Sequence, residues 1–391
     1  MSRSDRKIRV LYAMDSLGIG GAEQLILTLA QSLPKERFHV VICTFFSRGE
    51  HPEPIADEIR ALGIRVEQFT MTRWRDWHTM RRFLVLLDEE RIDIVHGHMV
   101  PADFWSCLLA KIGRRLKTVH TKHDILPRPG RANRFQRWVL ERLLSDRIVA
   151  ISEVVEDHMV EVRGVTRPRV VRIPDPVDTA RFHPGVSGAA VRRELGIPPE
   201  ALVIGNTSRF EKRKGYNLFL EVAALIAPHH RQVYFLAVGH GLERDAMEAY
   251  VRETGLTDQV IITGPRRDIP EVVAAMDIFL FTSLWGEGFG IVLIEAMASG
   301  KAMVAVNIGP PRELIEDGLS GYLPAPAEWA AETNRVDAEP LAKRLSWLIN
   351  HPNERKKLGE AAHRRAVELY STSAVIRQTE QVYREILGWT A

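Results

Sequence analysis

The amino-acid sequence predicts an α/β protein of two domains, each with a parallel sheet and crossover helices. Short apolar runs alternate with amphipathic stretches of helical period along the whole chain, which is typical of βαβ units. With 391 residues, the chain also exceeds the length at which a single core keeps growing. Its hydrophobic fraction of 45% is ordinary for a globular protein and excludes a mostly disordered or fibrous chain.

Each half of the chain begins with an apolar strand that a helix follows. The first helices of the two halves are expected at residues 22–33 and 216–227. Strands are expected in the first half at 7–14, 39–45, 93–98, 116–123 and 147–152. Strands are expected in the second half at 202–208, 233–239, 259–264, 277–283 and 302–307.

The two halves are joined by a segment rich in proline and glycine, between residues 172 and 200, where no hydrophobic period persists. We therefore assign residues 1–178 to an N-terminal domain and residues 179–370 to a C-terminal domain. Apolar residues at helical spacing predict that residues 371–391 close the chain with an amphipathic helix. A protein of this class is expected to bind its ligand in the cleft, outside the carboxyl ends of the strands.

Charge and cysteine content exclude several classes of protein. The net charge is only +3, which is too small to imply a nucleic-acid partner. Two cysteines, Cys43 and Cys107, cannot form a disulfide framework and favour a reduced, cytoplasmic setting. No uninterrupted apolar stretch is long enough to span a bilayer, so we expect a soluble or peripheral protein.

Basic and aromatic residues are interleaved in two segments of the first half. Residues 111–147 contain eleven basic and three acidic residues, together with Phe135 and Trp138. Trp74 and Trp77 lie in a second basic segment. Such segments fit either an anionic membrane surface, here the inner face of a membrane, or an anionic acceptor. They also fit a solvated face with ordinary aromatic residues.

The strongest local motif is LWGEGFGIVLIEAMASG, residues 284–300, in which three glycines lie between a strand and a helix. A helix N-terminus reached through glycines is suited to an anion such as a diphosphate. Glu295 follows within a helix that we expect to be buried all round, so its carboxylate needs a partner. That partner is either an internal salt bridge or the vicinal hydroxyls of a ribose. Glu287 lies in the glycine loop, where the polar part of a sugar would lie.

A second motif, SRFEKRKGY at residues 208–216, follows the first strand of the second half. Arg209 and Lys214 can neutralise a diphosphate, Arg209 by a bidentate fork and Lys214 as a point charge. Lys212 and Arg213 are expected to face solvent.

The first half offers glycines and histidines at strand ends. Gly20 and Gly21 stand at the start of the first helix, where backbone N–H groups can face a phosphate or an acceptor, although the dinucleotide fingerprint is incomplete. His96, His98, His120 and His123 lie at two strand ends. No spacing of histidine, cysteine or acidic residues indicates a metal site, and neither a serine-hydrolase nor a P-loop motif is present.

Several of these motifs together resemble glycosyltransferase family 4. They are the GIGGAE turn, the linker IPDPVDTARFHP, the SRFEKRKG loop, the element EGFGIVLIE and the segment AMASGKAMVAVNIGPPRELIEDGLSGYL. The resemblance extends from about residue 8 to residue 380 and implies the GT-B fold, with two Rossmann-like domains whose parallel sheets face each other across a central cleft. It implies that the first domain binds the acceptor, that the second binds the donor, and that the last helix crosses back to the first domain.

The resemblance implies a retaining transfer of a sugar from a UDP- or GDP-linked donor, with no metal and no further cofactor, to a glycan or lipid-linked acceptor in cell-surface polysaccharide assembly. By this match Glu295 holds the ribose, Glu287 the donor sugar, and Arg209 and Lys214 the diphosphate. The match also places Gly264 beside the nucleobase. Backbone groups of the glycine loop would join the diphosphate contacts, at Gly288, Phe289, Gly290 and Ile291. The histidine that contacts the sugar is His123 or His120, and the match favours His123.

The sequence departs from the family pattern at two places. Asp175 and Pro176 stand where Asn-Gly is common, and Ile308 stands where glycine is usual. Two alternatives to a transferase stay open at this point. One is an enzyme of the same fold that epimerises nucleotide sugars; the other is a catalytically silent module that binds them.

Overall fold

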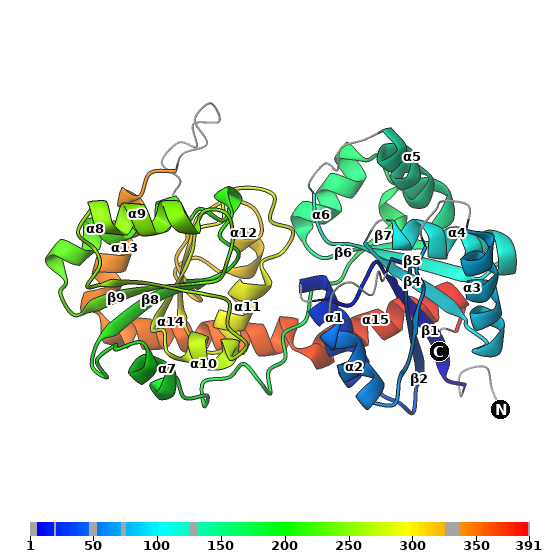
Figure 1. Cartoon of the computed structure of the whole chain (residues 1–391), viewed down its shortest axis with the longest axis horizontal. Helices are drawn as coiled ribbons and strands as arrows, with labels where there is room; N and C mark the ends of the chain where they lie inside the picture. Colours follow the sequence, from blue (N-terminus) through cyan, green and yellow to red (C-terminus); the bar gives the residue numbers. More distant parts are fainter. Residues whose placement is uncertain are drawn as a thin grey trace. The chain divides into compact units, whose positions relative to one another are not determined.

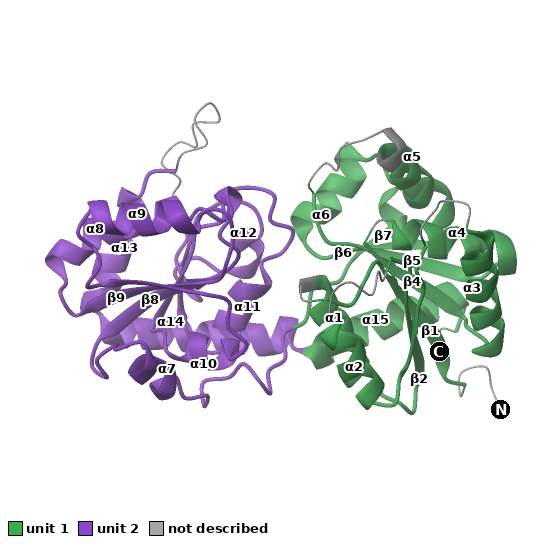
Figure 2. Ribbon diagram, viewed as in Figure 1, with its two compact units in different colours: residues 1–176, 372–391 green, residues 177–371 purple. Residues whose placement is uncertain are grey.

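The computed structural model describes residues 6–18, 21–46, 53–71, 76–99, 101–125, 131–324 and 336–389. The chain divides into two compact units, residues 1–176 with 372–391 and residues 177–371 (Figure 2). Each unit contains one parallel sheet with helices on both faces (Figure 1). This arrangement confirms the α/β class that the sequence predicts.

In the described residues, unit 1 has a seven-stranded sheet of order β3-β2-β1-β4-β5-β6-β7. Its strands are β1 (Ile8–Met14), β2 (Phe38–Thr44), β3 (Arg65–Gln68), β4 (Ile94–His98), β5 (Lys117–Lys122), β6 (Arg147–Ala150) and β7 (Val170–Arg172). The pairing is parallel throughout, with Val10 beside Ile94 and Ile94 beside Lys117. The edge strands β3 and β7 are absent from our sequence-based expectations, because both are short and lack a continuous apolar run.

Helices cover both faces of this sheet. Its helical segments are α1 (Gly21–Ser32), α2 (Pro54–Ala61), α3 (Trp77–Glu89), α4 (Ala102–Arg114), α5 (Arg131–Val139), η2 (Leu140–Leu144), α6 (Glu153–Asp157), η3 (His158–Val162), η4 (Arg167–Arg169) and α15 (Thr372–Leu387). Helices α1, α2 and α15 contribute to one core layer, and α3 and α4 contribute to the other (Figure 1). The closing helix α15 packs against α1 and buries Val375, Val382 and Tyr383 in the core of unit 1.

Unit 2 has a five-stranded sheet of order β10-β9-β8-β11-β12 in its described residues. Its strands are β8 (Leu202–Thr207), β9 (Val233–Val238), β10 (Val260–Thr263), β11 (Ile278–Phe281) and β12 (Ala302–Ala305). Its helical segments are α7 (Ala189–Glu194), η5 (Lys212–Lys214), α8 (Tyr216–Ile226), η6 (Ala227–His229), α9 (Arg244–Glu253), α10 (Ile269–Ala274), α11 (Ile291–Ala298), α12 (Pro311–Leu314), α13 (Glu339–Asn350), α14 (Pro352–Arg365) and η7 (Ala366–Tyr370). Strands β8, β9, β11 and β12 are almost entirely buried, as expected for a parallel sheet covered on both faces, whereas the edge strand β10 is mostly half-buried.

Candidate active site

The strand order of unit 2 creates a switch point between β8 and β11. From β8 the chain proceeds outward to β9 and β10, whereas β11 lies on the other side of β8 and is followed outward by β12. In open α/β sheets, ligands bind outside the carboxyl ends of the strands at such a point. The two loops that begin there are residues 208–215 and 282–290, which contain the charged motifs found in the sequence.

These two loops meet through an ion pair. The Nζ atom of Lys214 donates to Oε2 of Glu287 at 2.5 Å, and both side chains are largely buried. Burial alone would raise the pKa of Glu287, but the charge and hydrogen bond of Lys214, helped by Arg213, hold that pKa below its ordinary value. The switch point therefore carries a buried carboxylate that stays ionised at neutral pH.

Backbone contacts hold the two loops together around this pair. Gly215 caps α8 with a φ of 67°, and a Cβ atom at this position would lie 2.1 Å from the carbonyl oxygen of Thr282. The hydroxyl of Thr282 donates to the carbonyl of Lys214 at 2.9 Å. Because only glycine combines this φ with so close a contact, Gly215 is what allows Lys214 to face Glu287.

The four cations of the 208–216 motif occupy different environments. Lys214 is buried and Lys212 is exposed. Arg209 is 59% exposed and pairs with Glu211 at 2.7 Å. Arg213, which we expected to face solvent, is mostly buried: its side chain also pairs with Glu211 at 2.7 Å, and its charge acts on Glu287. Arg213 is thus a site cation that the sequence-based reasoning missed, because a run of charges does not show which of its members turns inward.

The glycine loop leads directly into α11. Gly290 precedes the first residue of the helix, Ile291, so the free N–H groups of the first turn face the end of the loop. The ring of Phe289 is buried and packs edge-on against Tyr370 at 5.8 Å, which anchors the loop to the body of unit 2. Our expectation that α11 is buried all round is wrong, because Ile291, Val292 and Glu295 are only half-buried. One stripe of the helix is left for contact with something outside this unit's core.

Glu295 lies on that stripe. Among the residues that the structure describes, none donates a hydrogen bond or forms an ion pair with its carboxylate. Burial raises the pKa of Glu295 to about 7, and the nearby charge of Arg181 opposes this rise. The guanidinium of Arg181 lies instead over the ring of Phe182. Of the two partners considered from the sequence, an internal salt bridge to another described residue is therefore not formed.

Two further loops extend the same edge of the sheet. Gly264 follows the carboxyl end of β10 and is half-buried, with its carbonyl accepting from the hydroxyl of Thr263 at 3.0 Å. The loop after β9 packs on the loop after β8, since a Cβ atom at Gly239 would lie 1.9 Å from the carbonyl oxygen of Ser208. The sequence-based reasoning missed this glycine loop. The segment VGHG, two glycines just after an apolar strand, is the signal that could have identified it.

In unit 1, the histidines at the ends of β4 and β5 form a hydrogen-bonded group. Nδ1 of His98 lies 3.1 Å from Nε2 of His123, and their rings are tilted by 30° at a centroid distance of 5.3 Å. His98 is fully buried and His123 is half-buried. Burial lowers the pKa of His123 to about 4, opposed by Asp124 and assisted by Lys122. Both rings are therefore neutral at physiological pH.

The other two histidines are bound within the core. His96 contacts Tyr383 and Thr121 through its two ring nitrogens, at 2.6 and 2.7 Å. His120 is buried, and its Nδ1 atom contacts Oγ of Ser145 at 2.8 Å. The structure therefore does not bring His120 to the surface, although the sequence-based reasoning left it open as a ligand contact.

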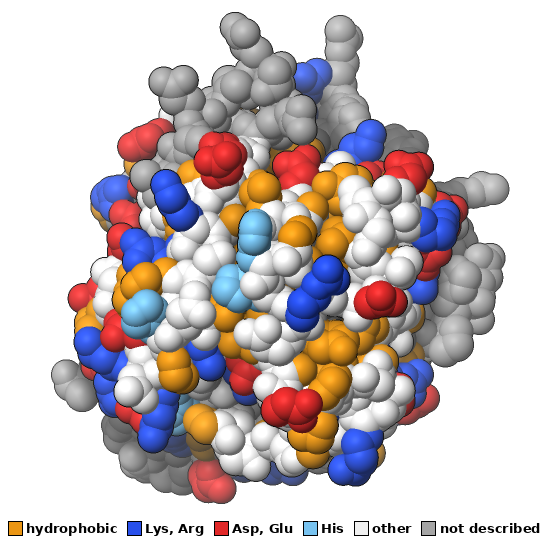
Figure 3. Space-filling view, turned by 90° about the vertical axis from the view of Figure 1, so that its left-hand side faces the viewer, with side chains coloured by type: hydrophobic (Ala, Val, Ile, Leu, Met, Phe, Trp, Pro, Cys, Tyr) orange, Lys and Arg blue, Asp and Glu red, His pale blue; other side chains and the backbone are white. Residues whose placement is uncertain are grey.

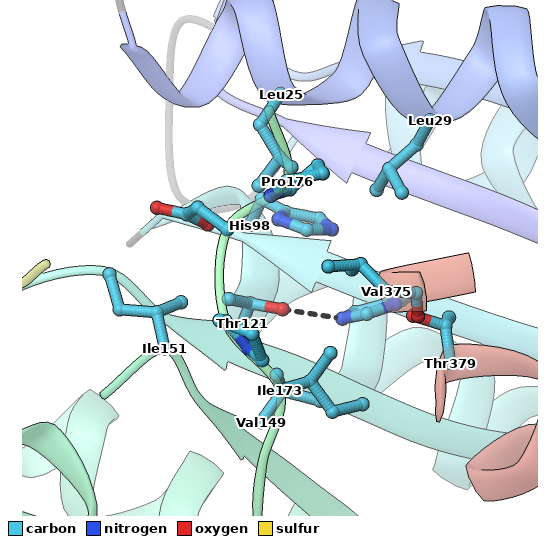
Figure 4. Close-up of a pocket in the computed structure, with 13 residues that line it drawn as sticks. Leu25, Leu29, His98, Thr121, Val149, Ile151, Ile173, Pro176, Val375 and Thr379 are labelled. Carbon is cyan, nitrogen blue, oxygen red and sulfur yellow. Dashed lines mark hydrogen bonds between the residues drawn. The ribbon is translucent and has the colours of Figure 1, made fainter. Parts of the chain in front are cut away.

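A small pocket lies beside His98 in unit 1 (Figure 4). Leu25 and Leu29 of α1, Val375 of α15 and Thr121 of β5 contribute to its walls. Of the two glycines proposed for an acceptor phosphate, Gly21 is the first residue of α1, and Gly20 lies outside the described residues.

Two properties of the described residues bear on metals and membranes. No three histidine, cysteine or acidic side chains there lie close enough together to hold a metal ion. None of the helices in the same residues is both long and apolar enough to cross a membrane. Figure 3 shows one face of the molecule, on which basic and acidic side chains are interspersed rather than gathered by sign.

Known proteins similar to this chain include curated glycosyltransferases. The UDP-Gal:alpha-D-GlcNAc-diphosphoundecaprenol alpha-1,3-galactosyltransferase of Escherichia coli is 23% identical over 333 residues, which cover 83% of this chain and 85% of that protein. A phosphatidylinositol N-acetylglucosaminyltransferase polypeptide of Arabidopsis thaliana is 27% identical over 393 residues, covering 97% of this chain and 83% of that protein.

Solved structures show the same fold. HepE of Anabaena, in complex with UDP-glucose, matches with a TM-score of 0.81 at 23% identity, covering 97% of this chain and all of that one. Sucrose-phosphate synthase from Thermosynechococcus elongatus matches with a TM-score of 0.73 at 19% identity, covering 98% of this chain and all of that one. The fold is therefore GT-B.

Two family models match the chain in succession. Glycosyltransferase Family 4 matches residues 19–181, and Glycosyl transferases group 1 matches residues 189–365. Together they span both units and confirm the resemblance found in the sequence. The chain belongs to glycosyltransferase family 4.

Proposed function

We propose that this chain is a retaining glycosyltransferase that moves a sugar from a UDP- or GDP-linked donor to a glycan or lipid-linked acceptor in cell-surface polysaccharide assembly. The proposal rests on the surroundings of the Glu295 carboxylate. It lies half-buried on a helix that follows the glycine loop, and none of the described residues binds it. A ribose diol would supply the two hydrogen-bond donors that this group lacks.

The remaining donor contacts follow from the loops at the carboxyl edge of unit 2. The N–H groups of Phe289, Gly290 and Ile291, with the backbone of Gly288, would bind the diphosphate at the start of α11. Gly264, at the end of β10, would lie beside the nucleobase, where the absence of a side chain leaves room for a ring.

The ion pair of Lys214 and Glu287 would be shared with the donor. Without ligand, the two groups neutralise each other. With a nucleotide sugar bound, Lys214 would donate to the diphosphate, and Glu287 would accept from hydroxyls of the sugar. Arg209 is exposed and paired only with Glu211 among the described residues, so it can turn to the diphosphate at little cost. His123 would contact the sugar.

Catalysis would depend on the charge that develops on the leaving diphosphate. The bond between the sugar C1 and the phosphate oxygen breaks while the acceptor oxygen bonds to C1 on the same face. The acceptor's proton passes to the leaving phosphate oxygen. Lys214, Arg209 and the first N–H groups of α11 would stabilise that oxygen, an electrostatic effect that is usually the largest in such reactions. We propose that these groups act without a metal ion.

The acceptor class is proposed from the relatives. One of them is named for a diphosphoundecaprenol-linked acceptor and another for phosphatidylinositol. In unit 1 the backbone groups of Gly20 and Gly21 would face the phosphate of such an acceptor. Because His98 is buried, it would not contact the acceptor and would act through its hydrogen bond to His123.

We also propose that one face of unit 1 docks on the anionic inner face of a membrane, which makes the protein a peripheral, cytoplasmic enzyme. Helix α4 packs against both α3 and η2, so these segments share one face of the sheet. Trp77, Ile112 and Phe135 are exposed there by 74%, 74% and 64%. Phe135 and Trp138 stack with rings 6.4 Å apart. Trp74 lies outside the described residues. Exposed aromatic and basic side chains on one face suit a lipid surface.

The transfer reaction can be tested with labelled nucleotide sugars and a lipid extract. We expect label in the lipid fraction, an unchanged anomeric configuration by NMR, and activity that persists in EDTA. Isomerised free donor would indicate an epimerase, and binding alone would indicate a silent module. Loss of activity in EDTA that a divalent ion restores would overturn metal independence. Lys214→Ala should reduce transfer by roughly 10²-fold or more. The exposed Lys212→Ala is its matched control and should leave transfer nearly unchanged.

A further inference from the structure

The pocket beside His98 contains two buried polar groups that lack partners. Nε2 of His98 is buried and has no hydrogen bond in the described part of the chain. Asp175 is buried, with 4% of the residue exposed, and no hydrogen bond or ion pair joins its carboxyl group to another described residue. His98, labelled in Figure 4, and Asp175 both line this pocket. An unbonded buried polar group costs about 1–3 kcal/mol, so both are expected to bind something within the pocket.

The other polar groups of the pocket are already satisfied. Both ring nitrogens of His96 are bonded, one of them to the hydroxyl of Thr121. The hydroxyl of Thr379 donates to the carbonyl of Val375 at 3.0 Å. This leaves His98 and Asp175 as the pair available to each other. No direct hydrogen bond joins them.

A water molecule can connect the two groups. The pocket has about 20 Å³ of free space, which exceeds the roughly 10–15 Å³ that one water needs. Asp175 is held between Pro174 and Pro176, and a following proline restricts its backbone to extended conformations. The backbone that carries Asp175 at the pocket wall is thus conformationally restricted. Burial raises its pKa to about 7, so the neutral acid is available as a donor.

The positions of the protons on Asp175, His98 and His123 depend on one another. If the acid of Asp175 donates through the water to Nε2 of His98, that nitrogen is an acceptor. The proton of neutral His98 then lies on Nδ1 and is donated to Nε2 of His123, 3.1 Å away. His123 must in turn carry its own proton on Nδ1. If His98 instead carried its proton on Nε2, its Nδ1 would accept from Nε2–H of His123, and Nδ1 of His123 would then be an acceptor.

We propose that Asp175 is a positioning residue that, through a water and His98, places the proton of His123 on Nδ1 and so makes this ring a hydrogen-bond donor. The inference rests on the proposed role of His123 at the donor sugar, and it assigns a role to the linker acid at which the sequence departs from its family. A wrong histidine tautomer is costly in other enzymes even where the geometry is kept.

The experiment measures the tautomer of His123 in the full-length protein without substrate, at pH 6. Long-range ¹H–¹⁵N correlation spectra distinguish a protonated Nδ1 from a protonated Nε2, and His123→Asn assigns the signal. We expect Nδ1–H in the wild type and in Asp175→Asn, because the amide still donates a hydrogen bond. In Asp175→Leu we expect a mixture of tautomers. We also expect transfer to fall about 10-fold or more, the scale for losing an outer hydrogen-bond partner.

His98→Asn decides the question if Asp175→Leu does not fold. Its shorter amide occupies the position of Nδ1 and keeps a contact with His123, but it cannot reach the pocket, so the mixture of tautomers should recur. An unchanged tautomer in either folded variant, or Nε2–H in the wild type, would overturn the proposal. Because the spectra need no activity, this outcome is distinct from an absence of sugar transfer, which would instead count against the proposed function.

Discussion

At the residue scale, the properties of the donor site arise from how each charge is desolvated. Glu287 and Glu295 are both acids near the same loop, yet their pKa values move in opposite directions. Glu287 has Lys214 in contact, whereas Glu295 has only the charge of Arg181 acting on it, without a hydrogen bond or ion pair, among the described residues. Glu287 can therefore exchange its contact with Lys214 for contacts with a ligand, whereas Glu295 can accept new hydrogen bonds from one.

The raised pKa of Glu295 predicts a pH dependence of donor affinity. A diol donates to the ionised carboxylate, which is about one-tenth populated at pH 6 and about nine-tenths at pH 8 for a pKa near 7. The affinity for the nucleotide-sugar donor should therefore rise about ten-fold over this range and should level off above it. Calorimetry can measure this, since the diphosphate diester of the donor does not titrate there.

Glu295→Gln is the control for this measurement. Its affinity should be weak at both pH values and should not change between them. A pH dependence that persists in this variant would assign the titration to another group, such as Asp175, whose pKa is also about 7.

The ion pair of Lys214 and Glu287 predicts that substitutions can affect protein stability and turnover independently. Lys214→Met leaves the carboxylate buried and uncompensated, so the free energy of unfolding should fall by about 3 kcal/mol. Turnover should fall by roughly 10²-fold or more. Adding Glu287→Gln should restore most of the stability but none of the turnover. If the double variant recovers activity, the pair has only a structural role.

At the scale of elements, the site depends on how closely two loops approach each other. Strand order places the carboxyl ends of β8 and β11 side by side. The remaining distance is closed by backbone contacts at Gly215 and Thr282. Loops held in this way transmit small backbone changes to the side chains that they carry.

Gly215→Ala should therefore be more damaging than an alanine at another left-handed glycine. Gly255 has nearly the same φ, 68°, but nothing lies within 4 Å of its Cβ position. Gly255→Ala should cost only the backbone strain, about 1–2 kcal/mol. Gly215→Ala should cost more in denaturant unfolding and should also weaken binding of the nucleotide-sugar donor. Equal costs at the two positions would show that the loop contact is unimportant.

The exposed face of α3, α4 and α5 predicts salt-sensitive binding to vesicles. Binding should be tight to vesicles with anionic lipid, weaker in high salt, and weak to neutral vesicles. Trp77→Ser with Phe135→Ser should reduce binding to the anionic vesicles. Leu242→Ser, on the other unit and 97% exposed, is the control. Equal binding to neutral and anionic vesicles would contradict a charge-dependent surface.

At the scale of the whole molecule, the chain order of the units has a structural consequence. Unit 1 is discontinuous, because α15 at the end of the chain supplies part of its core. Unit 2 is continuous, and its ends meet where the N–H of Val177 donates to the carbonyl of Tyr370 at 2.8 Å. The last helix is therefore a structural part of the unit that begins the chain.

Truncation after Ser371 should destabilise unit 1 selectively. The deletion exposes the apolar surface that α15 covers and removes Tyr383, which contacts His96 and Tyr12. We expect a lower melting temperature and rapid proteolysis within residues 1–176, whereas the proposed binding of the nucleotide-sugar donor by unit 2 should persist. Loss of nucleotide binding with intact unit 1 would reverse this assignment.

Much of the fold could be predicted from local pattern. The expected strands 202–208 and 277–283 contain β8 and β11, because a buried parallel strand needs an apolar run that the sequence shows directly. The edge strands β3 and β7 could not be predicted, since an edge strand is stabilised by its neighbour rather than by its own composition. The burial of α11 could not be predicted either. Its residues are almost all apolar, but how much of each is covered depends on the segments packed around the helix, and these leave Ile291, Val292 and Glu295 half-buried.

The sequence by itself determined the α/β class, the family, and which side chains stand at strand ends. These depend on residue type and spacing along the chain, which are local properties. Only the tertiary structure decided that Lys214 meets Glu287, that Arg213 turns inward, that Glu295 has no partner in the described residues, and that His98 lies between His123 and the pocket of Asp175. Contacts of this kind join residues far apart in the chain. They depend on strand order and on burial, neither of which residue spacing specifies.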